Sequence, residues 1–386
     1  MTSSLYLHVP FCVRRCLYCD FYVLPLGDGP PSKRIQEFRS LKHHRFLQAL
    51  DAELASLPDH FQPRTIYIGG GTPTEMGVSE LSKLFSSLKR HIDFSHVTEF
   101  CCEANPGTLD QDMAEFLVKQ GVNRVSLGVQ SFSDRMLQSL GRIHDANDAH
   151  EAVALLRNAG VQNLSIDLLF ALPQTECQDL SINLEAIQSL NPEHVSWYSL
   201  EFEPGTAFTE MRDQGFLQEP DEKVTAREYT EIRQGLSRCG YPQYELFSFG
   251  KPGYECLHNL NYWRGGEYYG VGPSAHSHVN GKRWSTLPDL STYIQKFCEG
   301  KGSCISEAEH LEPTAKAREL LMTQLRLIEG VNEHDFFKQS GHRIEDLLGA
   351  SLQVWEDAQW IIRQEDTLKL HPSAYLISDS LFREFI

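Results

Sequence analysis

The sequence lacks any long apolar segment and has little positive charge. No hydrophobic run approaches the roughly 18 residues that a membrane-spanning helix needs, and the first expected strand begins so close to Met1 that no signal or transit peptide fits before it. Lysine and arginine number 35 against 52 aspartate and glutamate residues, a formal net charge of −17. This charge argues against nucleic acid or an anionic lipid surface as a partner. We therefore expect a cytoplasmic protein with no direct membrane insertion.

Cysteine is also scarce, since ten in 386 residues are too few for a disulfide scaffold. Three of them, Cys12, Cys16 and Cys19, nevertheless form a Cys-x3-Cys-x2-Cys motif. Three thiolates on one short loop can hold three irons of a cubane iron–sulfur cluster and leave the fourth iron open for chemistry. Zinc is an alternative, but a structural zinc site wants a fourth nearby ligand, and His8 lies on the expected strand before the loop. Three buried free cysteines are a further alternative, which the two arginines inside the motif argue against.

Most of the chain alternates short β-branched or aromatic runs with longer amphipathic segments. This alternation predicts an α/β fold with a parallel sheet, of barrel or doubly wound type. The expected strands are Leu5–Val9, Thr65–Ile68, Val97–Glu103, Arg124–Val129, Leu164–Phe170 and Val195–Phe202. The expected helices are Phe38–Leu57, Val78–His91, Gln111–Lys119, Ala146–Asn158, Cys177–Ser189 and Glu222–Arg238.

The pattern changes after about residue 300. Helices are expected over 313–328, 332–339 and 344–357, followed by short strands at 360–363 and 367–370. That order is similar to a winged helix, but the acidic third helix would repel a DNA duplex, so a packing or docking role is expected. The predicted organisation is a first domain over 1–250, a connecting segment over 251–300 and a smaller winged-helix-like domain over 301–386.

Further motifs follow the cysteine loop in a fixed order. They are Gly69-Gly70-Gly71-Thr72-Pro73-Thr74, Glu103-Ala104-Asn105-Pro106, Ser126–Phe132, Leu140-Gly141-Arg142-Ile143-His144 and Asp167. Together with Tyr6 and the three cysteines, this order resembles the radical S-adenosylmethionine (SAM) family around oxygen-independent coproporphyrinogen III oxidase. The resemblance implies a partial (β/α)6 TIM-type barrel that holds a [4Fe–4S] cluster, whose open iron chelates SAM.

The same resemblance implies the residues of the SAM pocket. They are Tyr6, Tyr18, Gly70, Gly71, Thr72, Glu103, Gln130, Arg142 and Asp167, with Cys12, Cys16 and Cys19 as the metal ligands. The chemistry agrees, because carboxylates at the ends of strands accept hydrogen bonds from ribose hydroxyls or an ammonium group, and an arginine pairs with a carboxylate. Each residue taken singly would equally serve as a strand-end cap or a surface ion pair.

A second motif distinguishes branches of the family. The oxidase has a further cysteine two places after the third and an N-terminal extension, whereas this chain has Asp20-Phe21 there and eleven residues before Cys12. Coproporphyrinogen III dehydrogenation is therefore disfavoured. Instead, His258, Tyr262 and Trp263 form a His-Asn-x-x-Tyr-Trp sequence similar to the signature of the HemW branch of heme chaperones.

By that resemblance His258, Tyr262 and Trp263 bind heme, since an imidazole can ligate iron and aromatic rings offer flat apolar area. The alternative is a core histidine beside an aromatic pair. His276 and His278 are secondary candidates.

Three functions remain to be compared. The first is a heme chaperone with a cluster, SAM and heme as cofactors, which delivers heme to an apo-hemoprotein; the resemblance implies a respiratory membrane protein as acceptor and an electron donor as partner. The second is a radical SAM enzyme, an oxidoreductase or methyltransferase that acts on a porphyrin or another substrate through a 5′-deoxyadenosyl radical. The third is an inactive barrel retained for protein docking.

Overall fold

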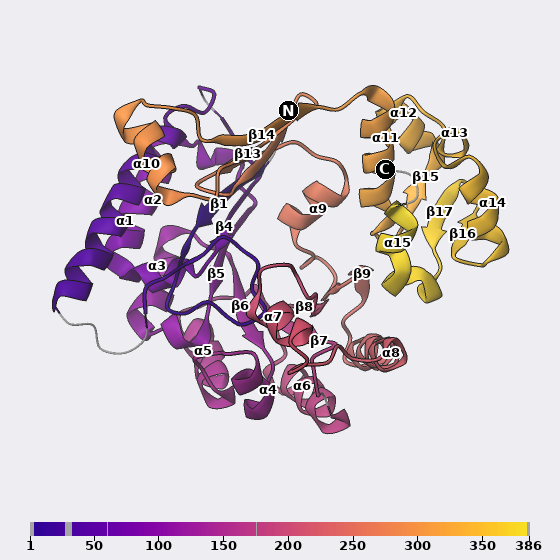
Figure 1. Cartoon of the computed structure of the whole chain (residues 1–386), viewed down its shortest axis with the longest axis horizontal. Helices are drawn as coiled ribbons and strands as arrows, with labels where there is room; N and C mark the ends of the chain where they lie inside the picture. Colours follow the sequence, from indigo (N-terminus) through magenta and orange to yellow (C-terminus); the bar gives the residue numbers. More distant parts are fainter. Residues whose placement is uncertain (1–3, 28–32, 60, 175, 384–386) are drawn as a thin grey trace.

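The computed structural model describes residues 4–27, 33–59, 61–174 and 176–383, and its centre is one large open sheet (Figure 1). Neighbouring strands at the centre run parallel, in the order β11 (Tyr268–Val271), β1 (Ser4–Val9), β4 (Thr65–Gly70), β5 (Glu99–Ala104), β6 (Arg124–Gln130), β7 (Leu164–Phe170) and β8 (His194–Ser199). The expected α/β fold is confirmed. The described strands do not close into a full barrel, in agreement with the partial barrel that was predicted.

Both edges of the sheet are antiparallel. Beyond β8 lie β10 (Ser248–Gly250) and β9 (Gln243–Glu245), and beyond β11 lie β12 (His276–Val279), β13 (Lys282–Thr286) and β14 (Ile305–His310). A two-residue pair, β2 (Phe11–Cys12) and β3 (Leu24–Pro25), brackets the cysteine loop. The segment expected to be a connection therefore supplies strands to the main sheet.

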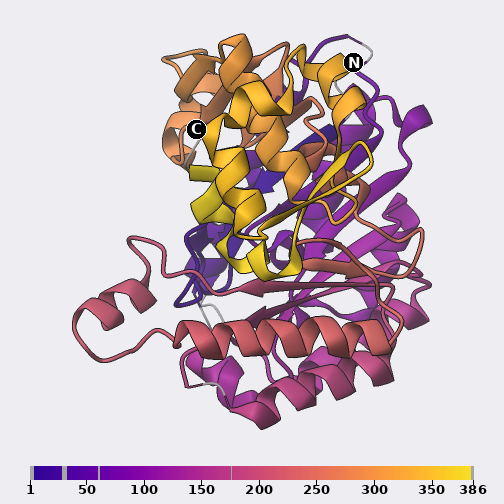
Figure 2. The same ribbon diagram turned by 90° about the vertical axis from the view of Figure 1, so that its right-hand side faces the viewer.

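Helices connect the parallel strands and cover the outer face of the sheet (Figures 1 and 2). They are α1 (Lys33–Leu54), α2 (Gly77–His91), α3 (Gln111–Gln120), α4 (Asp134–Ser139), α5 (Ala146–Asn158) and α6 (Cys177–Leu190), with α8 (Glu222–Arg238) after β8. The short α7 (Ala207–Asp213) instead stands apart from this layer and packs on the cysteine loop, where the Phe208 amide donates to the Leu17 carbonyl (Figure 2). Their ends follow local signals: Asp110 caps α3 by accepting from the Met113 amide, and Gly121 ends it with φ of 97°. Among the described helices, none is long and apolar enough to cross a bilayer.

Two further helices follow in the segment from 251 to 300. The short α9 (Leu257–Trp263) lies between the sheet and the C-terminal part, and α10 (Leu290–Glu299) packs beside α1 (Figure 1). The residues of the heme-chaperone signature thus lie on α9, where the two parts of the chain meet.

The C-terminal part contains α11 (Pro313–Leu325), β15 (Val331–Asn332), α12 (Glu333–Ser340), α13 (Ile344–Leu348), α14 (Ala350–Asp357), β16 (Ile361–Gln364), β17 (Thr367–Leu370) and α15 (Ser378–Arg383). Its sheet has the order β15-β17-β16. The third expected helix is divided because Gly349 adopts φ of 54° between α13 and α14. One continuous hydrophobic core joins this part to the main sheet.

Candidate functional site

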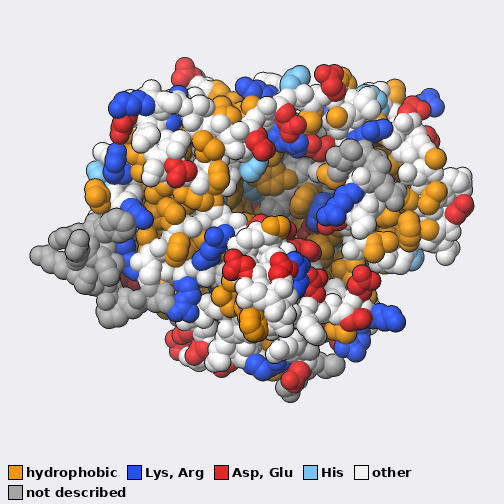
Figure 3. Space-filling model, viewed as in Figure 1, with side chains coloured by type: hydrophobic (Ala, Val, Ile, Leu, Met, Phe, Trp, Pro, Cys, Tyr) orange, Lys and Arg blue, Asp and Glu red, His pale blue; other side chains and the backbone are white. Residues whose placement is uncertain are grey.

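Two adjoining cavities are lined by the parallel strands, one beside the cysteine loop and one beside α9. The first, here called the cysteine cavity, has a volume of about 450 Å³ and is lined by Cys12, Cys16, Cys19, Arg142 and Asp167 among others. The second, called the aromatic cavity, has a volume of about 1200 Å³ and is lined by the residues of α9, β11, β12 and α11. Figure 3 shows the hollow between the sheet and the C-terminal part, with hydrophobic side chains inside it.

The three cysteines are free, partly exposed thiols that face the cysteine cavity. Burial raises the pKa of Cys12 to about 12 and that of Cys19 to about 11, so these thiols are protonated at neutral pH and must lose protons when they bind metal. Among the described residues, no three His, Cys, Asp or Glu side chains converge on one point, as a single metal ion requires. A cubane binds each thiolate through a different iron, so three thiols around one cavity fit a cluster.

Arg142 places a positive charge beside this loop. Its guanidinium donates to Cys16 Sγ at 3.2 Å, to Asn105 Oδ1 at 2.6 Å and to the Gly128 carbonyl at 2.6 Å. Arg142 Nε is buried and has no hydrogen-bond partner within the described part of the chain. A guanidinium with a spare buried donor suits an incoming carboxylate, such as that of an amino acid group bound next to the cysteines.

The glycine run after β4 packs tightly against the cysteine loop. The Gly71 amide donates to the Val9 carbonyl at 2.8 Å, and the Thr72 amide donates to the Phe11 carbonyl at 2.7 Å. A Cβ atom on Gly71 would lie 2.5 Å from the Phe11 carbonyl oxygen, closer than real contacts allow. Glycine is therefore needed here so that the strand can approach and hold the loop.

Carboxylates form the floor of the cysteine cavity. Glu103 accepts from Tyr67 Oη at 2.9 Å and from the Gly70 amide at 3.1 Å. Burial, with a smaller contribution from the charge of Asp167, raises the pKa of Glu103 to about 7. Asp167 accepts from Ser126 Oγ at 2.7 Å, and burial raises its pKa as well. These buried carboxylates have a strong preference for a cationic or hydroxyl-bearing ligand.

The structure brings most of the predicted SAM residues together. Tyr18, Gly70, Gly71, Thr72, Glu103, Gln130, Arg142 and Asp167 all line the cysteine cavity. Gln130 has φ of 71°, a left-handed conformation that is uncommon for this residue type and concentrates at functional sites. Tyr6 differs, because it lines the aromatic cavity, where its ring stacks on Tyr67 at 6.2 Å. The predicted heme residues His258, Tyr262 and Trp263 also line the aromatic cavity.

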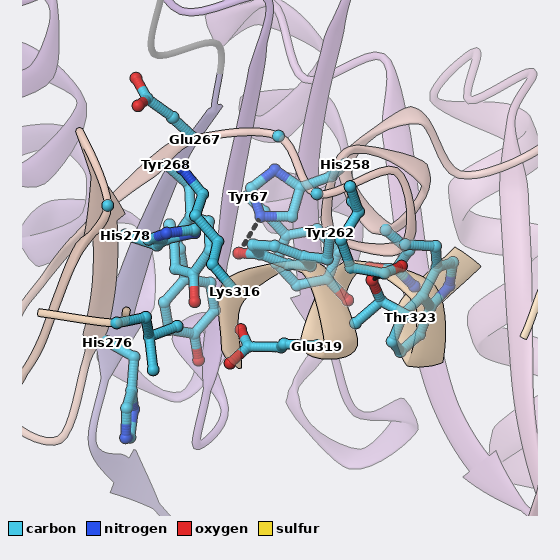
Figure 4. A pocket seen from close by; sticks show the side chains of 18 of the residues that line it. Tyr67, His258, Tyr262, Glu267, Tyr268, His276, His278, Lys316, Glu319 and Thr323 are labelled. Atoms are coloured by element: carbon cyan, nitrogen blue, oxygen red, sulfur yellow. Dashed lines mark hydrogen bonds between the residues drawn. The ribbon is translucent and has the colours of Figure 1, made fainter. Parts of the chain in front are cut away.

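His258 is buried in the floor of the aromatic cavity, and both of its ring nitrogens have partners. Nδ1 lies 2.8 Å from Thr65 Oγ1, and Nε2 lies 2.8 Å from Tyr262 Oη (Figure 4). Because the Thr65 hydroxyl donates its proton to Ser4 Oγ, it accepts from the Nδ1–H group of His258. The Nε2 atom of His258 then carries the lone pair and accepts from Tyr262 Oη. Burial lowers the pKa of His258 to about 3, so the imidazole is neutral.

A buried carboxylate holds α9 against the sheet. Glu99 on β5 accepts from the amides of Leu257 at 3.0 Å and His258 at 2.8 Å, and from Cys256 Sγ at 3.6 Å. Its carboxylate lies 3.9 Å from the guanidinium of Arg124, which is also buried. The start of α9 is thus tied to β5 by charge-assisted hydrogen bonds, and Glu99 is linked in turn to β6 by its ion pair with Arg124.

Comparisons with known proteins agree with this geometry. Residues 6–182 match the family model of the radical SAM superfamily. The chain is 32% identical to the heme chaperone HemW of Lactococcus lactis over 100% of this chain and 97% of the relative, and 33% identical to HemW of Escherichia coli over 99% and 98%. The chain belongs to the HemW family. The resemblance seen in the motifs is confirmed, and radical SAM membership implies a [4Fe–4S] cluster and SAM as cofactors.

The fold of this HemW family member is similar to that of a solved structure. It superposes on coproporphyrinogen III oxidase (HemN) of Escherichia coli with a TM-score of 0.84 and 20% identity, covering 100% of this chain and 90% of that one. At this identity the likeness concerns the fold alone.

Sequence reasoning missed several residues of the site. Thr65, Tyr67 and Glu99 lie at or near the starts of buried strands and contact α9 from far away in the sequence, and Arg124 pairs with Glu99. Charged residues inside otherwise apolar strands were the available signal, since buried charges need partners. Nothing in the sequence indicated which residue each of these side chains would contact.

Proposed function

We propose that this protein is a heme chaperone that binds a cluster and SAM in the cysteine cavity, binds heme in the aromatic cavity and passes the heme to an apo-hemoprotein. The proposal is carried by one observation: a chain similar over its whole length to HemW proteins has a large, aromatic-lined cavity formed around the HemW signature. The acceptor we propose is a respiratory membrane protein, which the family resemblance suggests, and reduction of the cluster requires an electron donor.

The aromatic cavity suits a flat macrocycle. Its volume of about 1200 Å³ exceeds the roughly 300–1,000 Å³ of ordinary ligand pockets. Tyr67, Tyr262 and Tyr268 supply rings, with Tyr262 and Tyr268 packed edge to face at 4.5 Å. Burial keeps the imidazoles of His258 and His278 neutral, the form that binds iron, because it lowers the pKa of each. Apolar faces with neutral imidazoles are what heme requires.

The cysteine cavity suits the cluster and SAM. Cys12, Cys16 and Cys19 would hold three irons, Arg142 would pair with the SAM carboxylate, and Glu103 would accept from its donor groups. When bound, the cluster supplies one electron at its open iron. Tyr67 separates this site from the aromatic cavity and lines both.

A radical SAM enzyme is the second candidate, and one observation favours it. A molecule in the aromatic cavity would lie next to the cysteine cavity, because seven residues line both: Asp20, Phe21, Tyr67, Gly70, Glu103, Tyr198 and Asn259. A substrate of a radical enzyme must lie close to its SAM.

Hemin titration of anaerobically reconstituted protein tests the first function. We expect a saturable Soret band at one heme per chain, and loss of that band to an added apo b-type cytochrome. The matched assay measures 5′-deoxyadenosine after addition of dithionite and SAM. Multiple turnovers with a modified porphyrin would establish the enzyme instead, and absence of saturable hemin binding would contradict the chaperone function.

SAM binding should depend on the protonation of Glu103. Since the carboxyl has a pKa of about 7, it is ionised above that pH and protonated below it. We expect SAM affinity, measured by anaerobic calorimetry, to fall as the pH decreases from 8 to 6, by up to about tenfold per pH unit. Glu103→Gln should weaken binding and flatten this profile, whereas Glu115→Gln, at an exposed position on α3, should leave both unchanged. An unaltered pH profile in Glu103→Gln would contradict the role of this carboxyl.

A further inference from the structure

The lone pair that His258 would offer to iron is already used. With its proton on Nδ1 toward Thr65, the imidazole accepts at Nε2 from Tyr262 Oη at 2.8 Å. The ring also stacks on Tyr67 at 5.1 Å with an interplanar angle of 28°, and the backbone amide of His258 is held by Glu99. Direct ligation by His258 would therefore break the bond to Tyr262 and move a packed ring.

His278 is placed differently. It lies on β12, directly across from Tyr268 on β11, and its ring packs edge to face on that tyrosine at 6.3 Å. Its Nε2 is buried and has no hydrogen-bond partner among the residues that the structure describes. Buried polar nitrogens without partners are rare in native proteins, and a ligand is one common reason for them. Figure 4 shows His278 on the same cavity as His258 but apart from the His258–Tyr262 pair.

Charged groups face His278 from three neighbouring elements. Glu319 and Lys316 come from α11, Arg283 from β13, and Glu267 from the turn before β11. Glu319 is bound by Arg283 at 2.7 Å, so it is not available to charge the imidazole by a close ion pair. Lys316 has no ion pair within the described ranges and lines the same cavity. A neutral imidazole next to an unpaired cation matches an iron porphyrin, which carries propionate groups.

We propose that His278 is the imidazole ligand of the heme iron, and that His258 is a positioning residue that fixes Tyr262 and the cavity floor. This inference rests on the proposed heme-binding function. The Nε2 lone pair of His278 forms the bond to iron, a water molecule leaves the metal, and no electron is transferred. Lys316 pairs with a propionate.

Spectroscopy of the full, cluster-reconstituted chain with hemin tests the assignment. His278→Ala should lose the histidine–iron signature in resonance Raman and electron paramagnetic resonance spectra, and added imidazole should restore it. His334→Ala is the control, because His334 is exposed on α12 and does not line the aromatic cavity; it should behave as the wild type. Tyr262→Phe frees Nε2 of His258 while keeping the ring, and it should leave the iron signature of His278 intact. Lys316→Gln should weaken hemin several-fold without changing the signature.

The outcomes separate the inference from the function on which it rests. If wild-type protein binds hemin but His278→Ala or His278→Gln keeps its signature, the assignment to His278 is wrong. If His258→Ala or His276→Ala loses the signature while His278→Ala keeps it, the histidine replaced in that variant is the iron ligand instead. If wild-type protein shows no saturable hemin binding, the proposed function itself fails. Iron content and circular dichroism of each variant establish that it is folded, and His278→Gln serves if the alanine variant is not.

Discussion

Cys16→Ser is expected to yield a protein that cannot retain its cluster. A serine hydroxyl is a hard, weakly acidic oxygen, whereas iron–sulfur clusters prefer soft thiolates. With only three cysteines on the loop, the loss of one leaves two protein ligands for four irons. Cys16 is also the thiol that Arg142 contacts at 3.2 Å, so the variant removes the sulfur that lies beside the guanidinium. We expect reconstituted iron and sulfide to fall at least tenfold and the visible absorption of the cluster to disappear.

Cys298→Ser is the matched control for this experiment. Cys298 is a free, exposed cysteine on α10 and does not line the cysteine cavity, so its substitution should leave iron and sulfide content unchanged. Anaerobic metal analysis of both variants gives the comparison. Wild-type iron content in Cys16→Ser, or zinc in the unmodified protein, would contradict a three-cysteine cluster site.

Glu99→Ala should cause the largest loss of stability among the site variants. The carboxylate accepts from two backbone amides and a thiol at the start of α9, and it compensates the charge of buried Arg124. Removing one partner of a buried charge pair costs about 3–5 kcal/mol, because the other charge is left unpaired. We expect this decrease in the free energy of unfolding, measured by urea denaturation of the cluster-free protein. The loosened α9 should also weaken hemin binding, since His258 and Tyr262 lie on that helix.

Glu115→Ala controls for the loss of a glutamate. Glu115 is exposed on α3 and is bonded only by the Gln111 side chain among the interactions described, so its removal should change stability by less than about 0.5 kcal/mol. Equal denaturation midpoints for Glu99→Ala and Glu115→Ala would show that the Glu99 network does not stabilise the fold. Tight hemin binding by a destabilised Glu99→Ala variant would show that α9 does not contribute to the heme site.

Local signals explain why much of the main sheet was predictable. The observed bounds of β7, α5 and α8 agree with the predicted ones residue for residue, because caps such as Asp145 and Asp221 mark where the helices begin. The cysteine loop was equally clear, since its chemistry depends on a spacing of a few residues. The family order of motifs then located the carboxylates and Arg142.

The edge of the sheet from β11 to β14 could not be predicted in the same way. β11 is four residues long, and it forms a strand because it pairs in parallel with β1, more than 260 residues earlier in the chain. Short strands depend on such pairings more than on their own composition. The environment of His258 has the same origin, because Thr65, Tyr67 and Glu99 all come from other strands. A motif identifies the histidine but not what its nitrogens contact.

The wall that the two cavities share also allows the distance between the two iron sites to be measured. Tyr67, Gly70 and Glu103 face both spaces, so if the proposed heme and the cluster occupy them, unpaired electrons on the iron of one would lie within dipolar range of the iron of the other. Faster spin relaxation of ferric heme when the neighbouring cluster is reduced would therefore report their separation directly, without any attached label. The two cofactors themselves would then serve as the spin probes for this distance.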